Sequence, residues 1–154
     1  MELLPLKENL EDNTEFLDHP DCKESLPMSI KFFKKVGYHP PWIGYYAQVD
    51  GELVGSGAFK GRPFRGKVEI AYGAFPQFRK KGVGSEICKE LVQLALKTNP
   101  AIRITARTLP VESFSTKILR KNSFQSQGTV IDDDDGEVWE WEYIPRATHG
   151  FTPR

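Results

Sequence analysis

The chain has 154 residues, of which 39% are hydrophobic and 27% charged, and its 21 basic side chains balance its 21 acidic ones. This length and composition are typical of one globular domain whose core needs no disulfide or structural metal. Zero net charge provides no broad positive field, which argues against a general nucleic-acid-binding protein and leaves room only for a local basic patch.

Two cysteines, Cys22 and Cys88, are too few for a disulfide framework. No stretch approaches the roughly 18 consecutive apolar residues of a membrane span, and the amino terminus lacks a secretion-signal pattern. We therefore expect a cytoplasmic protein in a reducing compartment, without a membrane partner. The histidines, His19, His39 and His149, lack metal-ligand spacing, so we predict surface positions for them and no metal site.

The first quarter of the chain is polar and interrupted by prolines, with one helix predicted near 28–36. Two segments rich in aromatic and β-branched residues, 42–49 and 53–59, follow it. Asp50-Gly51 lies between them, and this dipeptide favours the type I′ turn of a β-hairpin.

After the hairpin the spacing alternates between strand and helix. A third strand is predicted over 67–75, ended by Pro76, which cannot donate to a ladder. An apolar stripe then predicts a helix over 83–97, followed by a short strand over 102–106. Pro110 opens a second helix, whose predicted buried face comprises Val111, Phe114 and Ile118.

Two last strands, roughly 124–131 and 137–144, are joined by an acidic turn. The mixed order of strands and helices predicts a single α/β sheet with helices on its faces, without repeats or a dividing linker. We expect one domain over 1–154, with a mobile tail from Pro145 onward.

Two motifs resemble ligand sites but fail in detail. Residues 61–68 have the glycine spacing and lysine of a P-loop, yet Val68 replaces the magnesium-binding Ser/Thr and a strand follows instead of a helix. Residues 131–142 match part of a calcium loop, but Ile131 occupies the first ligand position, so a solvated hairpin turn is favoured.

A third motif, 79–85, lies between a strand and an amphipathic helix. Glycines at a helix start let the backbone approach a ligand, and the free amides and dipole of the first turn attract anions. Three cations immediately upstream complete an anion site. The alternatives are a basic helix start with flexible glycines and a dinucleotide site, which Ile87 disfavours because a third glycine is required there.

This segment resembles the GNAT superfamily of acyl-CoA N-acyltransferases, whose Arg/Gln-x-x-Gly-x-Gly/Ala signature is met by Arg79, Gly82 and Gly84. Residues 70–76 resemble the family's fourth strand, and 108–124 resemble its later strand-to-helix segment. The resemblance covers roughly 42–144. It implies a mixed, mostly antiparallel sheet that is splayed between the fourth and fifth strands, and a bulge or close backbone approach is expected at Gly73.

The sequence departs from the family pattern at three positions. Glu112 stands at the asparagine of the later segment, and Ser123 stands at the usual glycine before Phe124. Leu119 occupies the position where many members have a tyrosine that acts as general acid. Details of cofactor contact and the identity of the acid are therefore open.

The resemblance implies acetyl-CoA as cosubstrate, with catalytic roles for two side chains. Glu69 is the candidate base acting through water, or else an ordinary exposed strand residue. Ser115 is the candidate acid, or else a serine packed in a helix, with Tyr143 as a weaker option. Backbone amides at Ala74 or Phe75 would stabilise the oxyanion and bind the pantetheine arm. The pyrophosphate would be bound by Arg79, Lys80, Lys81, Gly82, Val83, Gly84 and Ser85.

These features predict an N-acetyltransferase that acts on a primary amine of a small molecule or a protein. The alternatives are a non-catalytic acyl-CoA-binding sensor or partner-binding module, and a nucleotide-binding protein using the same anion loop. The acceptor is expected near 38–46 and the last hairpin, where the aromatic side chains are interpreted as core. The acceptor's identity is unknown, and the oligomeric state is expected to be monomer or homodimer.

Overall fold

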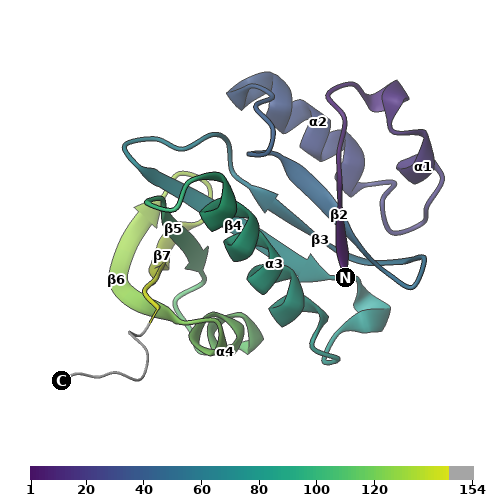
Figure 1. Cartoon of the computed structure of the whole chain (residues 1–154). Coiled ribbons are helices and arrows are strands. Elements are labelled where there is room, and N and C mark those ends of the chain that lie inside the picture. Colours follow the sequence, from purple (N-terminus) through teal and green to yellow (C-terminus); the bar gives the residue numbers. More distant parts are fainter. Residues whose placement is uncertain (146–154) are drawn as a thin grey trace.

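A seven-stranded sheet in the order β1-β2-β3-β4-β5-β7-β6 organises the computed structural model, which describes residues 1–145 (Figure 1). Every neighbouring pair is antiparallel except β4 with β5. The strands are β1 (Glu2–Pro5), β2 (Gly44–Val49), β3 (Glu52–Phe59), β4 (Lys67–Ala74), β5 (Arg103–Thr108), β6 (Phe124–Asp132) and β7 (Gly136–Tyr143). The helices are α1 (Thr14–Leu17), α2 (Ser25–Val36), α3 (Val83–Thr98) and α4 (Phe114–Lys121), with short 3-10 turns at Leu10–Asp12 and Pro76–Phe78.

The predicted hairpin and the helices flanking it are confirmed. Asp50 and Gly51 have φ values of 50° and 81°, as a type I′ turn requires, and they connect β2 to β3. The helix predicted near 28–36 begins three residues earlier, at Ser25, and the helix predicted over 83–97 extends to Thr98. The fold class predicted from the element order is therefore confirmed.

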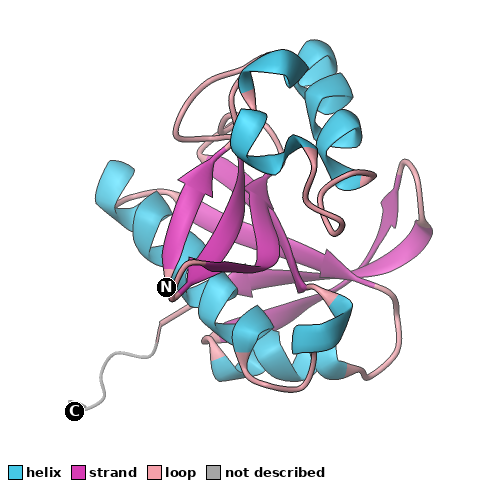
Figure 2. Ribbon diagram, turned by 90° about the vertical axis from the view of Figure 1, so that its right-hand side faces the viewer, coloured by secondary structure: helices cyan, strands magenta, loops and turns pink. Residues whose placement is uncertain are grey.

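Helices cover both faces of the sheet (Figure 2). On one face, Phe33 of α2 lies against Gly44 of β2; on the other, Ile87 and Leu91 of α3 lie against Gly57 of β3. Residues from both helical layers and from the strands form one hydrophobic core. The helix α3 packs against both β3 and β4, so it supports the carboxyl end of β4 from one face.

The front end is more ordered than its polar sequence indicates. The strand β1 pairs antiparallel with β2, and Phe16 and Leu26 are 1% exposed in the core. Asn13 is fully buried, and its side chain accepts a hydrogen bond from the Lys7 N–H at 2.8 Å and donates to the Asn9 carbonyl at 2.9 Å. This segment therefore packs as part of the fold, which the sequence prediction missed.

The helix α4 begins later than predicted, and its buried face is different. Ser113 caps the helix by accepting from the Thr116 N–H, and the Thr116 hydroxyl accepts from the Ser113 N–H in return. Because the helix begins after this cap, Val111 lies before it and is 56% exposed, while Phe114 is 60% exposed. The prediction that Val111 and Phe114 are buried is wrong; Thr116 and Leu119 are buried instead.

The acidic turn is a hairpin turn, as predicted. A carboxylate oxygen of Asp132 accepts hydrogen bonds from the N–H groups of Asp134 and Asp135 at 3.0 and 3.1 Å. His19 and His39 are half-buried, whereas His149 and the tail, 146–154, lie outside the described residues. Within residues 1–145, no helix is both long enough and apolar enough to cross a membrane.

Candidate active site

The strands β4 and β5 separate part-way along their length. They pair only from Lys67 with Arg103 to Ile70 with Ala106. Beyond this point β4 continues along β3 to Ala74, whereas β5 continues along β7. The end of β4 therefore has no strand on its β5 side, and the predicted splay between these strands is confirmed.

Hydrogen bonding to β3 determines which β4 amides face this split. The Lys60 N–H donates to the Glu69 carbonyl at 2.8 Å, and the Phe75 N–H donates to the Val54 carbonyl at 2.9 Å. Since ladder bonds alternate along an antiparallel strand, the amides of Tyr72 and Ala74 face the split. The Phe75 N–H is already bonded to Val54, so it cannot donate to a ligand in the split. Of the two backbone amides predicted to bind the cosubstrate and the oxyanion, Ala74 is therefore the one that remains available.

The expected irregularity at Gly73 takes a different form. The register between β3 and β4 runs without a shift, so there is no bulge at Gly73. The close backbone approach occurs at Gly55 of β3, the register partner of Ala74, because a Cβ added at Gly55 would lie 2.5 Å from the Gly73 carbonyl oxygen. A side chain at Gly55 would therefore push on the end of β4.

The loop after β4 has the backbone of an anion site. Lys80 and Gly82 have positive φ values of 65° and 83°, which turn the chain into α3. The Glu86 N–H makes the first bond of the helix, to the Gly82 carbonyl at 3.0 Å, so the preceding amides of the first turn remain free to bind a ligand. Arg79, Lys80 and Lys81 are all exposed beside these amides.

The helix α4 packs against the first turn of α3. A Cβ added at Gly84 would lie 3.1 Å from Ile118 Cδ1, so glycine allows this close approach. The Asn122 side-chain amide donates to Ser85 Oγ at 3.2 Å and to the Ile118 carbonyl at 2.9 Å. These contacts tie α4 to the start of α3 and hold the loop.

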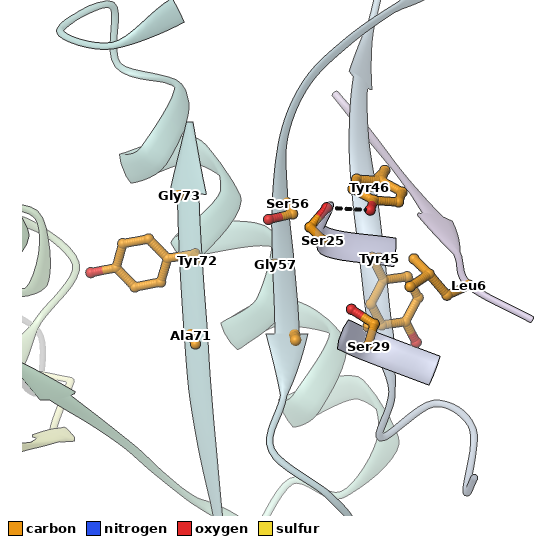
Figure 3. A pocket seen from close by; sticks show the side chains of 12 residues that line it. Leu6, Ser25, Ser29, Tyr45, Tyr46, Ser56, Gly57, Ala71, Tyr72 and Gly73 are labelled. Atoms are coloured by element: carbon orange, nitrogen blue, oxygen red, sulfur yellow. Dashed lines mark hydrogen bonds between the residues drawn. The ribbon is translucent and has the colours of Figure 1, made fainter. Parts of the chain in front are cut away.

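A cavity of about 280 Å³ lies between α2 and the sheet, next to the split end of β4 (Figure 3). Tyr46 and Ser25 share a hydrogen bond of 2.6 Å at its wall, and Ser56 of β3 lies beside them. The side chain of Tyr72 points away from this group (Figure 3). The cavity is lined by Leu6, Ser25, Ser29, Gly44, Tyr45, Tyr46, Ser56, Gly57, Ala58, Ala71, Tyr72 and Gly73.

The Glu69 side chain lies on the face of β4 that is directed toward the cavity. It precedes Ala71 by two residues, which places both side chains on the same side of the strand about 6.6 Å apart along it. The Lys60 ammonium lies 3.4 Å from a Glu69 carboxylate oxygen, and the Glu69 side chain is 23% exposed. The carboxylate is thus held near the cavity with access to solvent.

Comparison with known proteins identifies the family. A model described as the acetyltransferase (GNAT) domain matches residues 7–125. The chain belongs to the GNAT acetyltransferase family. Its membership confirms the enzyme class predicted from the sequence, a GNAT-type N-acetyltransferase. A search of curated proteins finds no match.

Three solved structures show that this GNAT chain has the fold of known acetyltransferases. A ribosomal-protein-alanine N-acetyltransferase from Brucella melitensis is 17% identical, with 94% of this chain and 100% of that chain covered and a TM-score of 0.64. The ribosomal-protein acetyltransferase RimL with coenzyme A is 17% identical over 92% of each chain, with a TM-score of 0.66. An aminoglycoside acetyltransferase with coenzyme A and kanamycin is 22% identical, and the match spans 65% of this chain and 64% of that chain at a TM-score of 0.57.

The candidate acids of the GNAT chain lie apart from Glu69. Ser115 is exposed and lines a separate hollow with Thr108 and Asp135. Leu119, at the position of the family's tyrosine, lies on the buried face of α4 and is 1% exposed. Tyr143 packs on Phe124 with ring centroids 5.6 Å apart and lines a hollow beside the start of α3. The structure therefore brings none of these side chains into the cavity beside β4.

Sequence reasoning missed the hydroxyl groups of this GNAT site. Ser25 and Tyr46 meet only because α2 packs over β2, and no local pattern connects them. Burial raises the pKa of Tyr72 well above its ordinary value, and its neighbour Cys88 has its pKa raised to about 12 by the same cause. Both groups remain protonated at neutral pH. The interpretation of the aromatic side chains as core residues is confirmed for Tyr46 and Trp141, which are both 1% exposed.

Proposed function

We propose that this GNAT domain transfers an acetyl group from acetyl-CoA to a primary amine of a small molecule or a protein. The observation that supports it most is the split between β4 and β5, because the anion loop follows at the same end of β4. A thioester inserted along β4 would therefore have its pyrophosphate at the start of α3. We propose that the domain extends over 1–154.

The cosubstrate would bind mainly through the backbone. The amides of Val83, Gly84 and Ser85, with the dipole of α3, fit a pyrophosphate, and Arg79, Lys80 and Lys81 supply positive charge. The pantetheine arm would pair with the split-facing backbone edge of β4, including the Ala74 carbonyl, as an added strand does. RimL and the aminoglycoside acetyltransferase were crystallised with coenzyme A, which supports this assignment.

The reaction needs a neutral amine. A lysine-like amine has a pKa of about 10.4, so its deprotonation at pH 7 costs roughly 4 to 5 kcal/mol. We propose that Glu69 accepts this proton through a water molecule, because its side chain lies on the cavity side of β4 beside Ala71. The cavity, with its serine and tyrosine hydroxyls, would receive the amine.

The amine nitrogen then bonds to the thioester carbon, and the carbonyl oxygen becomes an oxyanion. The Ala74 N–H, turned to the split, would donate to this oxygen. Collapse of the intermediate breaks the C–S bond and releases the CoA thiolate. Because a thiol has a pKa of only about 8.5, the thiolate can leave without a dedicated acid. Ser115, exposed in the hollow beside Thr108 at the end of β5, is the proposed proton donor that assists it.

A second candidate is a non-catalytic acyl-CoA-binding module. The observation that favours it is Leu119, whose apolar side chain is buried where many GNAT members have an acidic tyrosine. Both candidates require acetyl-CoA binding, and they differ only in turnover.

Calorimetric titration with acetyl-CoA, CoA, ATP and NAD tests the cosubstrate first. We expect acetyl-CoA to bind and the double variant Arg79→Ala, Gly82→Ala to lose it. Acetyl transfer to a panel of amines then tests catalysis: Glu69→Gln should lower kcat without weakening acetyl-CoA binding, whereas the exposed control Glu137→Gln should change neither. Binding without turnover on any amine would favour the module, and absence of binding by folded protein would overturn both.

We propose that the enzyme acts in the cytoplasm, as a monomer or homodimer. Cys22 and Cys88 are both free and buried, which is consistent with a reducing compartment.

A further inference from the structure

Small residues form the floor of the cavity between α2 and the sheet. Gly44, Ala58 and Ala71 lie directly opposite one another on β2, β3 and β4, and Ser56 lies opposite Gly73 in the next row. Residues paired in this way share one face of an antiparallel sheet. Because none of these side chains is larger than serine, the sheet leaves space between itself and α2. The cavity of about 280 Å³ occupies this space.

Serine hydroxyls line the cavity from both of its walls. Ser25 and Ser29 are four residues apart on α2, so they share one face of the helix, and Ser56 lines the same cavity from β3 (Figure 3). Ser25 is bonded to Tyr46 at 2.6 Å. Within residues 1–145, by contrast, the hydroxyls of Ser29 and Ser56 form no hydrogen bond with the protein. Two hydroxyl groups are therefore free to bond to a molecule in the cavity.

The lining of the cavity is electrically neutral. In the part of the chain that the structure describes, it includes no acidic or basic side chain. Burial raises the pKa of Tyr46 above its ordinary value, so this hydroxyl is uncharged at neutral pH. Glu69 is the carboxylate on the same face of β4, and the Lys60 ammonium lies 3.4 Å from it. A second ammonium group inside the cavity would therefore find no unpaired carboxylate, and removing such a charge from water is costly.

We propose that the acceptor is a monoamine with a neutral hydroxyl or amide group, which the Ser29 and Ser56 hydroxyls bind. This inference rests on the proposed function, because it requires the cavity to receive the amine. The reacting amino group is then the only charge of the acceptor, and its neutral polar group lies between α2 and β3. Free amino alcohols have this chemistry, and so does the amino terminus of a peptide that begins with a small polar residue.

Three amines of equal length test the class of acceptor. Pentylamine, 4-aminobutanol and 1,4-diaminobutane differ only in the group at the far end, which is a methyl, a hydroxyl or an ammonium group. We expect kcat/KM for 4-aminobutanol to exceed that for pentylamine about tenfold, as two added hydrogen bonds predict. It should exceed that for 1,4-diaminobutane about 100-fold, because the second ammonium group is unpaired. Ser56→Ala should reduce the advantage of 4-aminobutanol over pentylamine about threefold.

A charge placed in the cavity should invert the preference. Ser29→Asp supplies the carboxylate that the lining lacks, so it should raise kcat/KM for 1,4-diaminobutane relative to 4-aminobutanol at least tenfold. Ser29→Asn is the matched control, because it has nearly the same shape without the charge, and it should keep the preference against the diamine. Thermal unfolding of each variant verifies that it is folded.

The two sources of the acceptor are distinguished by comparing serinamide with seryl-alanyl-alaninamide. Faster acetylation of the tripeptide supports an amino terminus, and faster acetylation of serinamide supports a small molecule. Equal or faster acetylation of 1,4-diaminobutane than of 4-aminobutanol by the unmodified protein would overturn this inference alone, because acetyl transfer itself would persist. An unchanged preference in folded Ser29→Asp would do the same. Absence of turnover with every amine, in protein that binds acetyl-CoA, would instead overturn the proposed catalysis and this inference with it.

Discussion

A single methyl group at Gly55 tests whether the position of the β4 backbone governs catalysis. A Cβ at this position would lie 2.5 Å from the Gly73 carbonyl oxygen, 3.0 Å from Ala74 Cα and 2.8 Å from the flexible end of Ile87, at Cδ1. Two backbone atoms of β4 are involved, so relief requires the strand to move by about 1 Å, toward the ~3.5 Å optimum for non-bonded atoms. We expect Gly55→Ala to cost about 1–3 kcal/mol of folding free energy through overpacking. A 1 Å displacement of the Ala74 N–H should lower kcat about 100-fold.

Gly57→Ala is the matched control on the same strand: the Gly57 backbone lines the cavity, but its added Cβ would point away from it, toward α3. Its Cβ would lie 2.6 Å from Ile87 Cγ2 and 3.0 Å from Leu91 Cδ1, which are side-chain atoms of α3. Urea unfolding should show a comparable loss of stability for both variants, whereas acetyl transfer with the best amine of the panel should be impaired only in Gly55→Ala. Equal loss of kcat in the two variants would refute the reasoning, and so would full activity of a folded Gly55→Ala.

Three further predictions concern the loop, the acidic turn and the thiols. Gly82→Ala should cost about 1–2 kcal/mol in urea unfolding and weaken acetyl-CoA binding, because φ at this position is 83° and an L side chain is strained there; unchanged stability would contradict this. Arg107 and two backbone amides lower the pKa of Asp132 from 3.8 to about 2, so its stabilising effect is complete above pH 3.8 and is lost as the pH falls toward 2. The free energy of unfolding should therefore fall less between pH 6 and pH 3 in Asp132→Asn, and parallel curves would contradict the assignment. Burial raises the pKa of Cys22 to about 11 and of Cys88 to about 12, so at pH 8 about one thiol in a thousand or fewer is ionised and a thiol reagent should modify the protein only after unfolding; rapid labelling of the native protein would disprove this.

Features that depend on contiguous residues were predictable from the sequence. The Asp50-Gly51 turn follows from the backbone preferences of two adjacent residues, and the anion loop follows from its own glycines and cations. The family resemblance began with the signature in this loop and extended to residues 70–76 and 108–124. Consequently the fold class, the hairpin and the position of the loop agree with the structure.

Features that depend on distant partners were not predictable. The pairing of β1 with β2 joins residues about 40 positions apart, so a short segment such as Glu2–Pro5 has no local strand signal. The Phe75 amide points to Val54 because of the β3–β4 register, which no residue near Phe75 encodes. Similarly, the start of α4 was misplaced because the Ser113 cap, not Pro110, sets its first turn.

The short seam between β4 and β5 has a mechanical consequence. Strands β1 to β4 form one half-sheet and β5 to β7 another, and within residues 1–145 the seam from Lys67–Arg103 to Ile70–Ala106 is the only ladder between the two halves. Contacts of α3 with α4 also connect the two halves. A ligand that contacts both half-sheets would therefore resist their separation at this seam. Amide hydrogen exchange at Ile70 and Ala106 should slow when such a ligand binds, which makes this seam a sensitive reporter of occupancy.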